Sequence, residues 1–284
     1  MDVGVGLPNT LSVAGPLLVE WARRAEKRGF ATLSAIDRIA YPTYDSLTSL
    51  ALAAGATSRI GLATNILLAP LYPPAWLAKA TASLDAASGG RLTLGLGVGG
   101  RAEDFAAMGR SMEDRGRLMD DTLDVLHRAW AGQSVTGGDV PPGPPPANGN
   151  RIPILVGGTS DATVRRVVQY AEGWTAGGVG PAMAAPMMER VRRAWRAAGR
   201  EGEPRFTALH YFGLSDDEAS WAALRGYYGF LGDVGGMVVE SAARTPAAVN
   251  DVARSYADIG ITDLLLLPAV GAIDEVDRLA DAVL

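Results

Sequence analysis

The chain of 284 residues contains no cysteine and only two histidines, His127 and His210. The absence of cysteine excludes disulfides, thiolate nucleophiles and cysteine-based zinc or iron-sulfur sites, and leaves no need for an oxidising compartment. Two histidines so far apart in the sequence give little support to a metal site. A long hydrophobic run is also missing, because Asn65 and three prolines interrupt the most apolar stretch, Ile60–Ala78. A membrane-spanning helix is therefore not expected.

An excess of positive charge is missing too. The 26 Lys and Arg residues face 31 Asp and Glu residues, which gives a net charge of -5. Because phosphate backbones attract basic surfaces, a nucleic-acid partner is not expected. The opening MDVGVGLPN lacks the basic region and the apolar run of a secretory signal. With 48% hydrophobic residues the chain can bury a sizeable core, and we expect a cytoplasmic protein that binds neither nucleic acid nor membranes.

Short apolar runs alternate with helical periodicity from one end of the sequence to the other. Eight such alternations match a (β/α)8 (TIM) barrel, a fold of about 250 residues. A doubly wound open sheet is the alternative, but that fold usually contains five or six strand–helix units. The sequence therefore predicts a single (β/α)8 barrel domain over residues 1–284. The expected strands are Val3–Leu7, Thr32–Ile36, Ile60–Leu67, Leu92–Val98, Ile152–Val156, Gly173–Gly177, Phe206–Gly213 and Asp263–Leu267.

The predicted helices have recognisable ends. Leu18, Trp21 and Ala25 recur at helical spacing, and this pattern stops at Gly29, a residue type that commonly ends helices. Thr245 followed by Pro246 is typical of a helix start, with a hydroxyl cap and a proline in the first turn.

Two segments break this alternation. Gly137–Pro153 is too rich in proline and glycine for a helix or an interior strand, and it falls between the fourth helix and the fifth strand. We interpret it as a linker between half-barrels on the face away from the chemistry, and a proline-rich partner-binding segment is the alternative. Gly232–Glu240 is a second irregular segment, expected near the top of the barrel as either a lid or a plain connection.

The residues directly after each strand are the candidates for function, because barrels of this type have their active site at the C-terminal ends of the strands. After the fifth strand come two glycines, hydroxyl side chains and the start of a helix. Glycines allow close backbone approach and a helix N-terminus offers free N–H groups, which suits a phosphate. A plain helix cap with glycines in the turn fits the pattern equally well. The residues concerned are Gly157, Gly158, Thr159, Ser160 and Thr163.

The expected fourth strand carries leucines on one face and mainly glycines on the other. The empty face is filled either by a bulky neighbouring side chain or by a flat ligand across the strand ends. The loop that follows carries Arg101, Glu103 and Asp104. We expect these charges to be solvated, as most charges at a barrel rim are.

Asp37 and Arg38 directly follow the expected second strand. They form an ion pair or exposed surface, or else part of a pocket in which Arg38 orients an anionic or carbonyl substrate, with Tyr41 and Tyr44 as aromatic walls. His210 lies within the expected seventh strand, as either a satisfied core histidine or a group that points into the barrel. The sequence has no nucleophile elbow and no Walker loop.

Three segments follow one another in an order typical of a known family: SGGRLTLGLGVGGR, the downstream VGGTS, and the closing TPAAVNDVARSYADIGITDLLLL. They resemble the bacterial luciferase-like family of flavin- and deazaflavin-dependent oxidoreductases, and the resemblance covers nearly the whole chain. It implies a (β/α)8 barrel that holds FMN or the deazaflavin coenzyme F-420 at its top. It also implies a bulge in the third strand, often with a non-prolyl cis peptide. By position, it assigns the phosphate to Gly158, Thr159, Ser160 and Thr163, the bulge to Asn65 and Ile66, and the border of the ring system to Val98 and Gly99.

Two positions depart from the family pattern. Many relatives place a histidine, which serves as an acid, a base or a substrate ligand, where this sequence has Arg38. An arginine stays charged at neutral pH and cannot shuttle protons. Relatives similar to the deazaflavin-dependent sugar-phosphate dehydrogenase carry a glutamate where this sequence has Gly100, which argues against that activity.

The resemblance implies an oxidoreductase that uses reduced FMN or F-420 for hydride transfer to, or monooxygenation of, a small organic substrate. Asp37, Arg38 and His210 are the candidates for catalytic roles. Because the family histidine is missing, a non-catalytic flavin-binding barrel or an inactive partner subunit is the alternative. The expected partners are a flavin reductase that supplies reduced cofactor and a second copy of the chain, since relatives commonly dimerise through the second and third helices.

Overall fold

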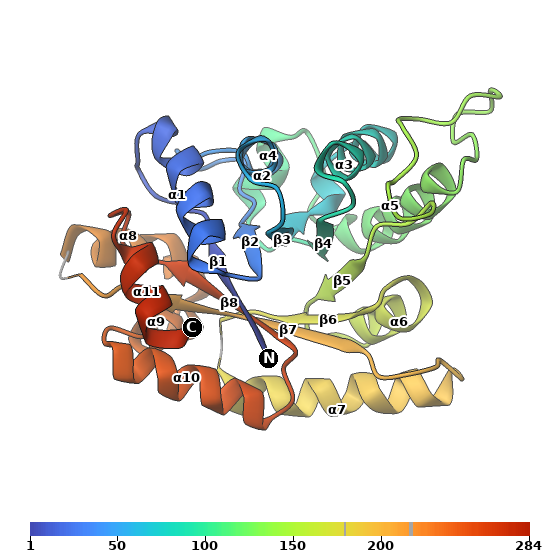
Figure 1. The fold of residues 1–284 in the computed structure, drawn as a ribbon. Coiled ribbons are helices and arrows are strands. Elements are labelled where there is room, and N and C mark those ends of the chain that lie inside the picture. The colour runs from blue at the N-terminus through green and yellow to red at the C-terminus, as the bar shows by residue number, and fades with distance from the viewer. Residues whose placement is uncertain (179, 216–217) are drawn as a thin grey trace.

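A computed structural model describes residues 1–178, 180–215 and 218–284. Eight parallel strands form a closed barrel in sequence order, and helices surround it (Figure 1). The predicted (β/α)8 barrel is confirmed, and the open sheet is excluded because β1 pairs with β8. The strands are β1 (Asp2–Gly6), β2 (Thr32–Ala35), β3 (Gly61–Leu68), β4 (Leu92–Gly97), β5 (Ile154–Gly157), β6 (Gly173–Ala176), β7 (Arg205–Phe212) and β8 (Asp263–Pro268).

The helices form where the sequence has an apolar stripe and end signals. In α1, Leu18, Trp21 and Ala25 are buried, and Gly29 ends the helix in the left-handed region at φ 95°. Thr245 caps the helix that follows it, accepting a hydrogen bond from the amide of Ala248. The helices are α1 (Gly15–Arg28), α2 (Ser46–Ala56), α3 (Pro74–Ser88), α4 (Ala102–Ala107), α5 (Arg115–Trp130), α6 (Asp161–Tyr170), α7 (Pro181–Ala197), α8 (Glu218–Tyr228), α9 (Asp233–Ser241), α10 (Pro246–Asp258) and α11 (Glu275–Val283), with short 3₁₀ turns η1 (Ala69–Leu71) and η2 (Gly229–Leu231).

The N-terminal end of the barrel is closed by polar side chains. Arg205 at the start of β7 forms a two-pronged ion pair with Asp263 at the start of β8, with distances of 2.9 and 2.6 Å. Its guanidinium also contacts the hydroxyl of Thr93 in β4. This partly buried ion pair links the starts of β7 and β8 at the bottom of the barrel.

The two irregular segments have different outcomes. Residues 137–153 contain no helix or strand and lie against the C-terminal end of α3, where the amide of Ala147 donates to Asp85 and the side chain of Asn148 donates to the carbonyl of Gly90. Its role as a linker between half-barrels stays a prediction. The prediction of an irregular segment at Gly232–Glu240 is wrong, because all of these residues except Gly232 belong to α9.

None of the helices in the described residues is long and apolar enough to cross a membrane.

Candidate active site

A cavity of about 390 Å³ opens at the C-terminal ends of the strands. Residues within or directly after β2 to β7 line it, together with residues of α8, η2 and α9. It brings together seven of the residues that the sequence singled out, whereas Thr159, Ser160 and Thr163 lie next to its rim. The seven are Asp37, Asn65, Ile66, Val98, Gly99, Gly157 and Gly158.

The floor of the cavity is built by a bulge in β3. Its register against β4 shifts between Thr64 and Leu67, and the peptide bond between Asn65 and Ile66 is cis. Both features were expected from the resemblance. The side chain of Ile66 occupies the place that a Cβ at Gly97 would take. At Gly97 the glycine face of β4 is therefore filled by a bulky neighbour, as one of the two alternatives expected.

Glycines from three successive strand ends form one wall of the cavity. Gly99 and Gly100 follow β4, and Gly158 and Gly177 follow β5 and β6. A Cβ added at Gly177 would meet nothing within 4 Å, so this position borders open space. We call the set Gly99, Gly100, Gly157, Gly158 and Gly177 the glycine wall. At Gly177 and Gly100, where a Cβ would meet nothing closer than 3.9 Å, a ligand can approach the backbone closely.

The loop after β5 leads from the glycine wall to the N-terminus of α6. Ser160 caps this helix, accepting a hydrogen bond of 3.2 Å from the amide of Thr163. The hydroxyls of these two residues lie 3.2 Å apart, and Gly158 has a positive φ of 111°. The cap interpretation is thus confirmed. It leaves the other N–H groups of the first turn, together with the positive end of the helix dipole, for an anion.

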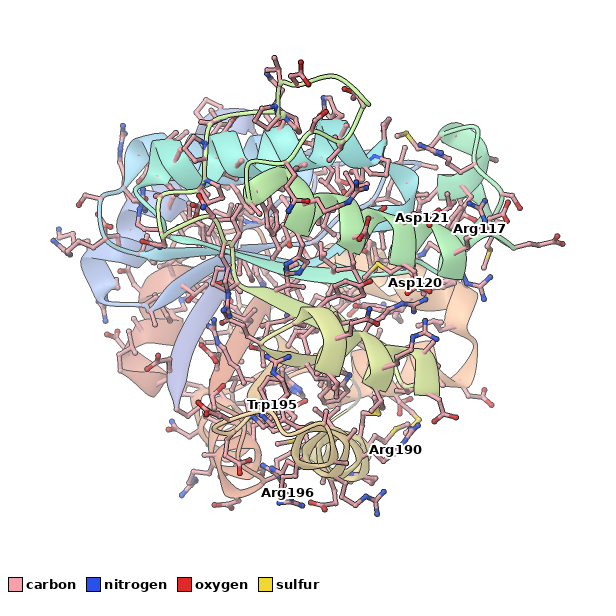
Figure 2. All side chains as sticks on the ribbon, turned by 90° about the vertical axis from the view of Figure 1, so that its right-hand side faces the viewer. Arg117, Asp120, Asp121, Arg190, Trp195 and Arg196 are labelled. Atoms are coloured by element: carbon pink, nitrogen blue, oxygen red, sulfur yellow. The ribbon has the colours of Figure 1, made fainter. Side chains whose placement is uncertain are left out.

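Arg190 of α7 adds a positive charge beside this loop, which the sequence did not indicate. Its guanidinium donates to the carbonyl of Thr159 at 2.9 Å and forms an ion pair with Asp161. Figure 2 shows Arg190 on α7 and Asp120 on α5, the helices that flank α6 on its two sides. Asp120 pairs with Arg166 of α6 at 2.6 Å. Arg190 stands in an arginine-rich helix, and nothing local distinguishes it from its neighbours.

Asp37 is a buried carboxylate at the edge of the cavity. It accepts hydrogen bonds of 3.0 Å from the amide of Leu68, 3.0 Å from the hydroxyl of Tyr72 and 3.2 Å from the hydroxyl of Ser46. Burial raises its pKa to about 6, because the charged form loses its hydration, and the hydrogen bonds oppose this only in part. The carboxylic acid and the carboxylate are therefore both populated near neutral pH.

The expected pairing of Asp37 with Arg38 is wrong. The Nε of Arg38 lies 2.8 Å from Oδ2 of Asp104, and both side chains are buried. Asp104 also accepts from the amides of Ile39 and Ala40. The expectation that Asp104 is a solvated rim charge is therefore wrong as well. Arg38 does not line the cavity, so its fork is directed at α4 rather than at a substrate.

Tyr41 and Tyr44 are not cavity walls. Tyr41 packs edge-on against Tyr227, with ring centres 5.1 Å apart, and the guanidinium of Arg38 lies over both rings. The hydroxyl of Tyr44 donates to the carbonyl of Val13 at 2.7 Å. Both tyrosines support the rim from behind, which corrects their expected role as aromatic walls.

His210 faces outward from β7 and away from the cavity. Its Nε2 lies 2.9 Å from the carbonyl of Ser241 in α9, and its ring is edge-on to Tyr256 of α10. Burial lowers its pKa, which favours the neutral ring. His210 is therefore a core residue and does not point into the cavity, and of its two ring nitrogens only Nε2 has a hydrogen-bond partner among the described residues.

The roof of the cavity comes from the segment after β7. Tyr227 and Tyr228 of α8, Phe230 of η2, and Val234 and Val238 of α9 all line it. The sequence predicted the position of this roof near the seventh strand but none of these side chains.

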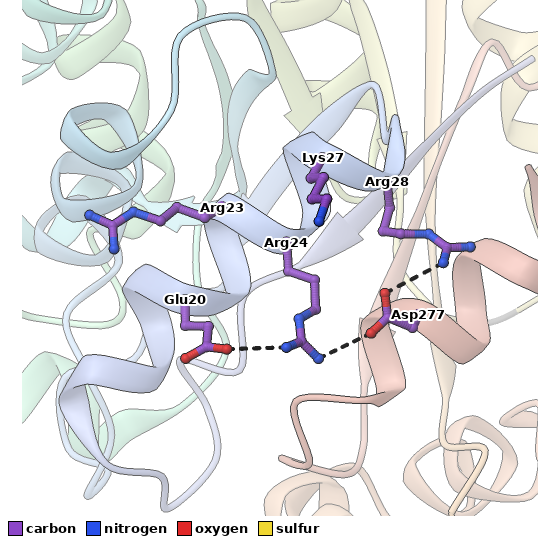
Figure 3. A pocket seen from close by; sticks show the side chains of 6 residues that line it. All are labelled: Glu20, Arg23, Arg24, Lys27, Arg28 and Asp277. Atoms are coloured by element: carbon purple, nitrogen blue, oxygen red, sulfur yellow. Dashed lines mark hydrogen bonds and ion pairs between the residues drawn. The ribbon is translucent and has the colours of Figure 1, made fainter.

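A second hollow, of about 540 Å³, lies outside the barrel between α1 and α11 (Figure 3). Charged side chains line it, among them Arg23 and Lys27. Arg24 bridges Glu20 and Asp277 within it, and Arg28 also reaches Asp277. It is far from the strand ends where barrels carry out chemistry. We therefore place the active site in the cavity at the top.

A sequence model described as luciferase-like monooxygenase matches residues 4–263. The chain belongs to the luciferase-like monooxygenase family. Membership of this family supports an oxidoreductase. The chain is similar to an uncharacterized protein of Mycobacterium tuberculosis, with 31% identity over 206 residues, which cover 63% of this chain and 71% of the relative.

Solved structures of luciferase-like relatives share the fold. An F420-dependent secondary alcohol dehydrogenase in complex with an F420-acetone adduct has a TM-score of 0.80 at 17% identity, covering 100% of this chain and 98% of the other. The oxygenating constituent of 3,6-diketocamphane monooxygenase from Pseudomonas putida, in complex with FMN, has a TM-score of 0.76 at 15% identity, covering 99% and 95%. At such identities the likeness shows the fold alone.

Proposed function

We propose that this chain is an oxidoreductase that holds reduced FMN or the deazaflavin coenzyme F-420 at the top of the barrel. It uses the coenzyme to reduce or to oxygenate a small organic substrate. The observation that carries the proposal is the glycine wall, which runs into the N-terminus of α6. The family, and the FMN or F420 named for the solved relatives, support the proposal.

The residues fit such a coenzyme at both of its ends. A tricyclic ring needs close access to the cavity lining, and the glycine wall and Ile66, which both line the cavity, lack bulky polar side chains that would block it. A phosphate needs several N–H donors and positive charge, which the first turn of α6 supplies, with Arg190 beside it. Asn65 adds a buried side-chain Nδ2 without a hydrogen-bond partner among the described residues. This donor is available to a polar group at the cavity floor.

The bound coenzyme supplies a hydride or, in the case of reduced flavin, activates oxygen. The chain contributes binding and the exclusion of water. Apolar side chains dominate the walls away from the glycines, and Ile36, Leu68 and Leu209 are among them. Water held away from the reacting centre leaves fewer side reactions.

Asp37 is the acid-base group in this proposal. Asp37 is among the residues that line the cavity, and a pKa of about 6 lets it both hold and release a proton at neutral pH. Tyr72 and the amide of Leu68 fix the orientation of its oxygens. Arg38 stands where many relatives have a histidine, but its guanidinium is engaged by Asp104.

The experiment is to incubate the purified protein separately with reduced FMN and with reduced F-420 and a panel of candidate substrates. Substrate-dependent oxidation of one coenzyme, followed by its absorption band, supports the proposal. Tight binding without turnover identifies a coenzyme-binding module instead. Absence of binding to either coenzyme refutes the proposal.

We also propose that two copies of the chain associate through α2 and α3. A groove of about 460 Å³ runs between these helices, lined largely by small or apolar residues that include Ala51, Trp76 and Ala80. Trp76 exposes a large apolar side chain in this groove, and Leu52 exposes another on α2 outside the groove lining. Exposed apolar side chains of this kind are typical of interaction surfaces. Sedimentation of wild type and of Leu52→Arg tests this: wild type is expected as a dimer and the variant as a monomer.

A separate flavin reductase as the source of reduced FMN stays a proposal.

A further inference from the structure

The roof of the cavity exposes an unusual group of apolar side chains. Phe230, Leu231 and Val234 are 45%, 40% and 39% exposed, and all three line the cavity. Large apolar side chains left in water are unfavourable, and a contiguous group of them marks a binding surface. The group lies on η2 and α9, beyond the glycine wall that we assign to the coenzyme. It therefore belongs to the substrate end of the cavity.

Charged groups at this end are already engaged. Among the described residues that line the cavity, Asp37 and Arg101 alone are charged. Arg101 donates from Nη2 to the carbonyl of Tyr227 at 2.7 Å, and its guanidinium lies 3.7 Å from the ring centre of Phe230 and 4.5 Å from that of Tyr227. A guanidinium over an aromatic face forms a cation–π interaction, so the charge of Arg101 is already partnered by the two rings.

The contacts of Arg101 also fix the position of Phe230. Arg101 follows the glycine wall directly, whereas Phe230 belongs to the roof after β7. A Cβ at Gly100 would lie 3.9 Å from the ring of Phe230, so the roof touches the coenzyme side at this point. The planar guanidinium, stacked between two rings and bonded to a carbonyl, sets how far the ring of Phe230 reaches over the cavity.

We propose that the substrate is an uncharged, apolar compound that packs against Phe230, Leu231 and Val234, with Arg101 as the positioning residue that holds Phe230. This inference rests on the proposed function, because it names the substrate class of the same site. An anionic substrate would lose its hydration in this apolar cavity, and Arg101, the one cation among the described lining residues, already contacts two aromatic rings. An uncharged compound meets no such penalty.

The experiment is equilibrium dialysis with a matched pair of probes, neutral 2-acetylnaphthalene and anionic 2-naphthoate, on the free protein and on protein with FMN or F-420. We expect the ketone to bind at least about tenfold more tightly than the carboxylate, since burying an unpaired charge is costly. Phe230→Ala is expected to weaken ketone binding about fivefold through lost apolar contact. Met237→Ala is the control, because Met237 is 52% exposed on the same roof but does not line the cavity.

Two variants of Arg101 separate positioning from anion binding. Arg101→Lys keeps the charge but loses the planar fork, so it and Arg101→Ala are both expected to weaken ketone binding as Phe230→Ala does. The proposal would be overturned if wild type bound naphthoate more tightly than the ketone, and if this binding were lost in Arg101→Ala but kept in Arg101→Lys. Arg101 would then be the residue that binds an anionic substrate. Ketone binding unchanged in Phe230→Ala would also overturn it. Coenzyme titration of the same proteins is read separately, so a failure to bind coenzyme counts against the proposed function and not against this inference.

Discussion

The guanidinium of Arg38 and the carboxylate of Asp104 form a buried ion pair, with Nε and Oδ2 2.8 Å apart. Arg38→Ala leaves the charge of Asp104 buried and without its cation. We expect a loss of about 3 to 5 kcal/mol in the free energy of unfolding, measured by urea denaturation. Arg117→Ala removes exposed ion pairs instead and is expected to cost less than about 1 kcal/mol. Equal losses in the two variants would show that the buried pair does not stabilise the fold.

The raised pKa of Asp37 predicts a pH dependence of stability. Because the pKa rises from 3.8 in the unfolded chain to about 6 in the folded one, the protonated group favours the folded state. This contribution is fully present below pH 4 and is lost as pH rises through 6, by about 3 kcal/mol in total. Asp37→Asn removes the titrating group, so the difference between wild type and variant is expected to change between pH 4 and 7. A constant difference over that range would contradict the assignment.

Gly177 gives a direct test of the glycine wall. A Cβ at this position meets nothing within 4 Å, so Gly177→Phe is expected to leave the backbone in place and to put its ring into the cavity that Gly177 lines. Coenzyme binding, followed by fluorescence titration, should fall by more than about a hundredfold, equivalent to about 2.7 kcal/mol. Gly138→Phe in the segment before β5 is the control and should bind normally. Unchanged affinity in Gly177→Phe would place the coenzyme elsewhere.

The N-terminus of α6 predicts a preference for a phosphorylated ligand. Wild type should bind FMN more tightly than riboflavin. In Ser160→Asp the new carboxylate still caps the helix but repels the phosphate, so the preference should shrink by about tenfold. Thr245→Asp makes the same change at the cap of α10 and should leave the preference intact. An unaltered ratio of the two affinities in Ser160→Asp would remove this loop from the site.

The sequence predicted the parts of the molecule that depend on local signals. The strands show as short apolar runs, the helix starts and ends show as Thr245 and Gly29, and the bulge at Asn65 and Ile66 follows from the family resemblance. Each of these features is set by residues that are close together in the chain. This is enough to place the active site at the top of a barrel.

Contacts between distant segments were not predictable in the same way. Asp104, the ion-pair partner of Arg38, lies 66 positions away in the sequence. Tyr72, which donates a hydrogen bond to Asp37, follows η1 and lies 35 positions away. Whether His210 points inward depends on a register of one residue, since neighbouring side chains in a strand face opposite ways. The glycines around Gly235 suggested a loop. The structure instead needs Gly235 in α9, because a Cβ there would collide with the carbonyl of Tyr228.

The most direct test of the account is a crystal structure of the protein soaked with FMN or with F-420. The account predicts the ring system against the glycine wall and Ile66, with the phosphate at the first turn of α6 beside Ser160. Coenzyme bound in the charged hollow between α1 and α11, or a cavity at the strand ends that stays closed to both coenzymes, would contradict it.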